Sequence, residues 1–124
     1  MAEGRWRNDV PIYRQLRDRI ADMILEGDLA QGDVLPSVRE VAAEHRVNPL
    51  TVLKGYQLLV EQQIVESRRG RGMFVLPGAR DRLLALQRAE FLGEQWPQIR
   101  AKVERLGLDW DELLGPVKND RKKT

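Results

Sequence analysis

The 124-residue sequence contains no cysteine and only one histidine, His45. The lack of cysteine excludes disulfide bonds and thiolate metal sites, and it agrees with a reducing compartment. No apolar run approaches the roughly 20 residues that a membrane-spanning helix needs, and the first residues lack the apolar core of a signal peptide. These absences predict a cytoplasmic protein with no membrane segment, no metal and no cofactor.

An excess of charge of one sign is also missing, because 21 Lys and Arg residues face 19 Asp and Glu residues. Residues 1–78 carry eleven basic and eleven acidic residues, and residues 79–124 carry ten and eight. The chain is therefore not a polycation. A nucleic-acid partner would have to be bound through local basic clusters.

Signs of catalysis are scarce as well. His45 lies one position before a turn, and the Gly70 and Gly72 pair lies in a hairpin rather than between a strand and a helix, so it is no nucleotide fingerprint. The carboxylates show no convergent pair that the sequence can place. An enzyme is therefore the least favoured class, and we assign no catalytic residue.

Residues 35–59 form the most informative stretch. Ser37, followed three residues later by Glu40, is a capping-box pattern that predicts a helix over residues 38–45. Asn48 is a second helix cap, and Pro49 takes the favoured first helical position. The sequence thus predicts two helices joined by the short link 46–48.

This pattern is typical of a helix-turn-helix, in which the N-terminal side chains of the second helix reach base edges in the major groove. The exposed edge of that helix would present Asn48, Leu50, Thr51 and Lys54. An αα-hairpin in any small helical domain remains the alternative at this point. Gly55 should cost this helix about 1 kcal/mol relative to alanine.

Two β-prone runs follow, and an Arg/Gly turn separates them, which predicts a β-hairpin. Arg68, Arg69 and Arg71 lie at its tip, where they are costly for packing and suited to phosphate groups. A hairpin directly after a helix-turn-helix is a winged helix. The alternative is a solvated turn that happens to be basic.

Residues 1–9 are polar and are expected to be frayed, with Trp6 either loose, packed on the first helix or close to a phosphate backbone. An apolar stripe predicts a first helix from about residue 10 that ends at Gly27, with Asp9 as a possible cap.

After residue 78 the composition shifts to helix formers, and apolar residues repeat every 3.5 positions. Pro97 should kink or split this helix, and Asp109 with Glu112 predicts a short last helix. The seam could fold onto Trp110 within the chain, or pair with a second copy. A segment of about 46 residues is too small to bury it comfortably alone, so we expect dimerisation through Leu84, Phe91, Leu92, Trp96, Ile99, Val103, Leu106 and Leu113. Phe91, Trp96 and Trp110 allow two interpretations, a site for a small-molecule effector at the seam or part of the core.

Taken together, segments 11–13, 32–42, 47–56 and 69–75 resemble the GntR family of bacterial transcription regulators, and the Asn-Pro-x-Thr-Val link with the short C-terminal part resembles the YtrA subfamily. Gln63 departs from the glycine that is usual before the first wing strand. The resemblance implies a repressor that binds a palindromic double-stranded DNA operator as a homodimer. It implies DNA contacts by the arginine after Leu-Pro-Ser-x, by the start of the recognition helix and by the wing tip. The expected DNA-binding residues are Ser37, Arg39, Asn48, Leu50, Thr51, Lys54, Arg68, Arg69, Gly70, Arg71 and Gly72. A winged-helix protein-interaction adaptor without sequence-specific DNA binding is the alternative.

The expected fold is mostly α with a small β-hairpin (α+β). Residues 1–78 are expected to form a winged helix-turn-helix DNA-binding domain, residues 79–117 a helical dimerisation or effector region, and residues 118–124 a disordered tail.

Overall fold

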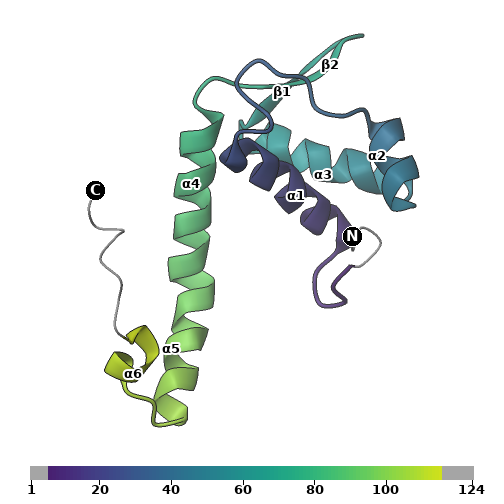
Figure 1. Ribbon diagram of the computed structural model, residues 1–124. Coiled ribbons are helices and arrows are strands. Elements are labelled where there is room, and N and C mark those ends of the chain that lie inside the picture. The colour runs from purple at the N-terminus through teal and green to yellow at the C-terminus, as the bar shows by residue number, and fades with distance from the viewer. Residues whose placement is uncertain (1–5, 116–124) are drawn as a thin grey trace. The chain divides into compact units, whose positions relative to one another are not determined.

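The computed structural model describes residues 6–115 (Figure 1). The chain divides into two compact units, Met1–Leu86 and Gln87–Thr124, and each is described by itself. The tail expected at 118–124 lies outside the described residues.

The first unit is mostly helical with one hairpin, as the sequence predicted. Helices α1 and α2 both pack against α3, and the hairpin follows α3 directly (Figure 1). The core includes Ala79 and Leu83 of α4, beyond the boundary expected at residue 78. The elements are α1 (Ile12–Glu26), α2 (Val38–His45), α3 (Pro49–Glu61), β1 (Val65–Arg68), β2 (Gly72–Val75) and α4 (Ala79–Glu90), whose last residues belong to the second unit.

Side-chain caps fix the two motif helices where the sequence placed them. The Glu40 amide donates to Ser37 Oγ at 3.0 Å, and the Ser37 amide donates to Glu40 Oε1 at 3.2 Å. The Leu50 amide donates to Asn48 Oδ1 at 2.8 Å. Arg46 ends α2 in the left-handed conformation, with φ of 56°. Each cap satisfies a backbone group that a helix end leaves open, so α3 has a defined starting residue.

Gly55 lies where α3 crosses α1 at close range. A Cβ at this position would lie 2.7 Å from the Tyr13 carbonyl oxygen, which is closer than non-bonded atoms approach. The expected helix-propensity cost is therefore outweighed by packing, because an alanine would have to push the two helices apart.

The N-terminal residues differ from expectation. Asp9 does not cap α1; its carboxylate instead accepts a hydrogen bond from Arg7 Nη2 at 2.8 Å, and that bond lowers the pKa of Asp9. The sequence predicts a frayed segment over residues 1–9, but residues 6–9 fold back on α1. Gln15 bonds both the amide and the carbonyl of Arg7, and the Arg19 guanidinium lies 4.0 Å above the Trp6 ring. Residues 1–5 lie outside the described part of the chain.

The hairpin has antiparallel register, with Arg68 opposite Gly72 and Glu66 opposite Phe74. Gly70 takes a φ of 73° at the tip, which favours glycine. Val34 forms an isolated bridge with Phe74, so the segment before α2 lies along the wing.

In the second unit, the helical run is not split at Pro97. The π-helical turn η2 (Phe91–Gln95) precedes α5 (Trp96–Arg105), and the Trp96 amide donates to the Phe91 carbonyl. Helix α6 (Trp110–Leu114) begins where expected, with the Asp109 amide bonded to Glu112 Oε1 at 3.0 Å. The rings of Trp96 and Trp110 lie 5.6 Å apart, so α5 and α6 are packed together.

Candidate nucleic-acid interface

The N-terminal edge of α3 is open to solvent. Asn48, Leu50 and Lys54 are exposed, and Thr51 is half-buried. Val52, on the opposite side of the helix, is completely buried and fixes the rotation of α3 against the core. The packing of α3 therefore turns the expected recognition edge outward.

Lys54 is held by a contact that the sequence did not suggest. Its Nζ lies 4.3 Å from the centre of the Tyr13 ring, a distance at which the ring face attracts an ammonium group. Tyr13 belongs to α1, so the first helix orients a cation on α3. In the sequence, Tyr13 and Lys54 are 41 positions apart in two different helices, and no local pattern connects them.

Arg39 lies in the first turn of α2 and is exposed. Among residues 6–115 its guanidinium makes no hydrogen bond, ion pair or ring contact, so it is available to a partner. The segment just before α2 is held by Tyr56, whose hydroxyl donates to the Pro36 carbonyl at 2.7 Å. Burial, with the Glu40 carboxylate adding to it, raises the pKa of the Tyr56 phenol well above its usual range. The phenol is thus a fixed neutral donor that positions the start of α2.

The wing arginines differ in how firmly they are held. Arg68 lies 4.3 Å from the Phe74 ring centre and pairs with Glu66 at 2.8 Å, while Arg71 lies 5.7 Å from the same ring. Arg69, at the tip, has no such partner among the described residues. Phe74 thus serves as a platform under the wing cations, and in the hairpin it lies opposite Glu66.

A cleft of about 360 Å³ is lined by the wing, by Tyr56 and by the segment that leads into α2. Its walls carry two of the expected DNA-binding groups, because Ser37 lies on one side and the arginine tip on the other. The lining residues are Val34, Leu35, Pro36, Ser37, Val38, Tyr56, Ser67, Arg68, Arg69, Gly70, Arg71, Gly72 and Met73. The structure thus brings the Ser37 end of α2 and the wing together across one concave surface.

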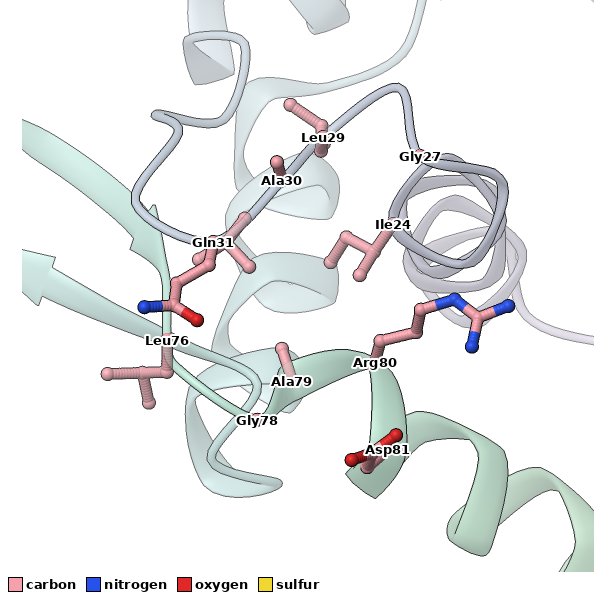
Figure 2. A pocket seen from close by; sticks show the side chains of 11 residues that line it. Ile24, Gly27, Leu29, Ala30, Gln31, Leu76, Gly78, Ala79, Arg80 and Asp81 are labelled. Carbon is pink, nitrogen blue, oxygen red and sulfur yellow. The ribbon is translucent and has the colours of Figure 1, made fainter.

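A second cavity of about 350 Å³ lies between the end of α1, the loop after it and the start of α4 (Figure 2). Ile24, Leu29 and Ala79 give it an apolar wall. The Arg80 side chain turns toward α1 and its Nε donates to the Leu25 carbonyl at 3.2 Å, so the nearest cation is already used to cap that helix.

The residues expected at a dimer seam are mostly exposed. Of that set, Val103 is buried and Trp96 half-buried, while the others are at least 38% exposed; they are Leu84, Phe91, Leu92, Ile99, Leu106 and Leu113. Phe91, Trp96 and Trp110 contact one another in series, with ring centres 6.3 and 5.6 Å apart. These three residues therefore form an aromatic cluster.

Residues 12–75 match the model of the bacterial regulatory proteins of the gntR family. That segment is half of the chain and contains every element from α1 to β2. The chain belongs to the GntR family.

This GntR-family chain is 34% identical to the HTH-type transcriptional repressor YtrA of Bacillus subtilis, over 86% of its own length and 82% of that protein. Among solved structures, a GntR family transcriptional regulator from Listeria monocytogenes matches with a TM-score of 0.71 and 27% identity, over 88% of this chain and 94% of that one. The DNA-binding domain of AraR in complex with operator ORX1 matches with a TM-score of 0.52 and 29% identity, over 53% and 80%. The YtrA subfamily and the winged helix-turn-helix fold are thereby confirmed. Across residues 6–115, no helix has the length and hydropathy to cross a bilayer.

Proposed function

We propose that this protein is a sequence-specific DNA-binding transcriptional repressor that binds a palindromic operator as a homodimer. The observation that carries the proposal is the open edge of α3, where Asn48, Leu50 and Lys54 are exposed while Val52 behind them is fully buried. A helix edge that is capped at its start and uncovered fits the major groove. AraR, whose related domain is solved with its operator, shows that this fold serves DNA binding in another protein.

Charge placement supports the same reading. Arg39, Arg69 and Lys54 belong to three different elements, and none of them is neutralised by an acidic side chain within the described residues. Arginine and lysine contacts to phosphate release counterions, so we expect affinity to fall steeply as salt rises. The groups that would fix the register of the duplex are thus present without a large net charge.

The homodimer part of the proposal rests on the exposed apolar residues of the second unit. Leu92 is 58% exposed and Leu106 is 59% exposed, although a single soluble chain gains by covering such side chains. A second copy would cover both seams at once, and two recognition helices would then enter successive major grooves about 34–36 Å apart.

The experiment that tests the proposal is the selection of bound duplexes from a random pool with the full chain. We expect an enriched consensus of two inverted half-sites. An enriched site without inverted symmetry would contradict the dimeric operator, whereas binding without any sequence preference would contradict the repressor and favour the adaptor.

A further inference from the structure

Leu50 is the most exposed of the large apolar side chains among residues 6–115, at 70%. It is the second residue of α3, and its amide is bonded to Asn48 Oδ1 at 2.8 Å. Because the cap holds its backbone and Val52 is fully buried, the direction in which the Leu50 side chain leaves the helix is fixed. A large apolar group thus projects into water from a defined position at the start of the helix.

Packing within the protein does not account for a leucine at position 50. On this edge Asn48 and Thr51 are polar and the adjacent Pro49 is itself exposed, and Leu50 is absent from the hydrophobic core and from the residues packed against it. An apolar side chain in this place contributes nothing visible to the fold, so its role is best sought in a bound partner.

On the major-groove side of B-DNA, each base edge presents hydrogen-bond donors and acceptors, and thymine alone adds a methyl group. A leucine cannot pair with a donor or acceptor, and pressing it against one would leave that polar group without a partner. Contact with the thymine C5-methyl avoids this cost and removes apolar surface on both sides from water.

We propose that Leu50 is a specificity-determining residue that reads the C5-methyl group of one thymine in each operator half-site. This inference rests on the proposed function, since it presumes that the edge of α3 enters the major groove. Asn48 and Thr51, which flank Leu50, would bond polar base edges or phosphates beside that thymine. The operator should therefore contain a thymine that cytosine cannot replace.

The test uses the full chain and the selected operator, in which each thymine is replaced in turn by uracil. This replacement removes the methyl group and leaves every hydrogen-bonding atom of the base unchanged. Burial of one methylene-sized group corresponds to about a fourfold change in affinity. We expect one thymine in each half-site at which uracil weakens binding by about fourfold, and about fifteenfold when both are replaced.

The matched variants are Leu50→Ala and Thr51→Ser, each of which shortens an apolar part of the same edge. Leu50→Ala should bind the thymine and the uracil operators equally, while Thr51→Ser should keep the fourfold difference. Thermal unfolding should be unchanged in Leu50→Ala because the side chain is exposed. Loss of the difference in Thr51→Ser alone would overturn the inference, since Thr51 would then be the residue that reads the methyl group.

Two further outcomes separate the inference from the proposed function. A protein that selects an operator but shows no uracil effect at any thymine would overturn the role of Leu50 and leave the repressor intact. A protein that selects no sequence at all would overturn the proposed function, and this inference would fail with it.

Discussion

At the scale of single residues, Gly55 shows how local and tertiary effects oppose each other. Glycine weakens a helix by its freedom in the unfolded chain. In this structure the absence of a Cβ leaves room for the Tyr13 carbonyl. An added Cβ would lie 2.7 Å from that carbonyl oxygen. The close approach of α3 to α1 thus depends on the residue that weakens α3 in isolation.

We therefore expect Gly55→Ala to lower the free energy of unfolding by about 1–3 kcal/mol, as overpacking does in other cores. Urea denaturation, monitored by circular dichroism, measures this change in the free energy of unfolding. Gly93→Ala is the matched control, because a Cβ there meets nothing within 4 Å. That control should leave stability unchanged or raise it by up to about 1 kcal/mol, and a Gly55→Ala protein as stable as the control would show that the helices can move apart freely.

Arg39 is a residue for which function and stability can be separated. It is exposed, and its guanidinium makes no hydrogen bond, ion pair or ring contact within residues 6–115, so Arg39→Ala should leave the unfolding temperature unchanged. Loss of a DNA contact by arginine costs about 1–3 kcal/mol, which is roughly 5- to 150-fold in affinity. Fluorescence anisotropy with the selected operator measures this, and an affinity equal to that of the wild type would remove Arg39 from the interface.

At the scale of elements, the ends of α2 and α3 are held by bonds between segments that are distant in sequence. Tyr56 of α3 bonds the Pro36 carbonyl just before α2, and Arg82 of α4 bonds the Gln63 carbonyl just after α3 at 2.9 Å. Gln63 itself has a φ of 62°, a left-handed conformation for which glycine is the usual residue. The hydrogen bond from Arg82 thus holds the carbonyl of this strained residue, which lies between the end of α3 and the wing.

The Tyr56 bond predicts a dependence of stability on alkaline pH. Because the folded state raises the pKa of this phenol, the folded protein keeps its proton when the unfolded chain, with a pKa of about 10, releases it. The stabilisation is complete below pH 10 and is lost as pH rises above that value toward the folded pKa. Wild-type protein should therefore lose stability above pH 10, as denaturant melts at a series of pH values would show.

Tyr56→Phe is the comparison for that experiment. It removes both the bond to Pro36 and the titrating group, so stability at neutral pH should fall by about 1 kcal/mol. The decline above pH 10 should become shallower than in the wild type. An equally steep decline in both proteins would assign the alkaline transition to other groups.

At the scale of the whole molecule, exposed apolar residues predict self-association. Ile99 of α5 is 43% exposed, and a glutamate there would place two carboxylates close together in the proposed dimer. Ile99→Glu should therefore sediment as a monomer and bind the operator weakly. Gln98→Glu, the neighbouring exposed position, should remain a dimer, and a dimeric Ile99→Glu protein would place the contact elsewhere.

Much of this protein was determined by the sequence alone, because the signals are local. Ser37 with Glu40 and Asn48 with Pro49 set the helix starts through caps within three residues. Alternating β-prone residues around Gly70 set the hairpin. Local chemistry of this kind works without distant partners, and it sufficed for the fold class and the family.

Only the tertiary structure decided which of these residues are supported and which are free. Tyr13 under Lys54, Phe74 under Arg68 and the tight fit at Gly55 join positions that no short-range pattern connects. The tertiary structure also decided the N-terminal segment, where Gln15 of α1 bonds the Arg7 backbone and Asp9 bonds Arg7 instead of capping α1. Such contacts depend on how helices cross, and crossing is set by the packing of the whole core.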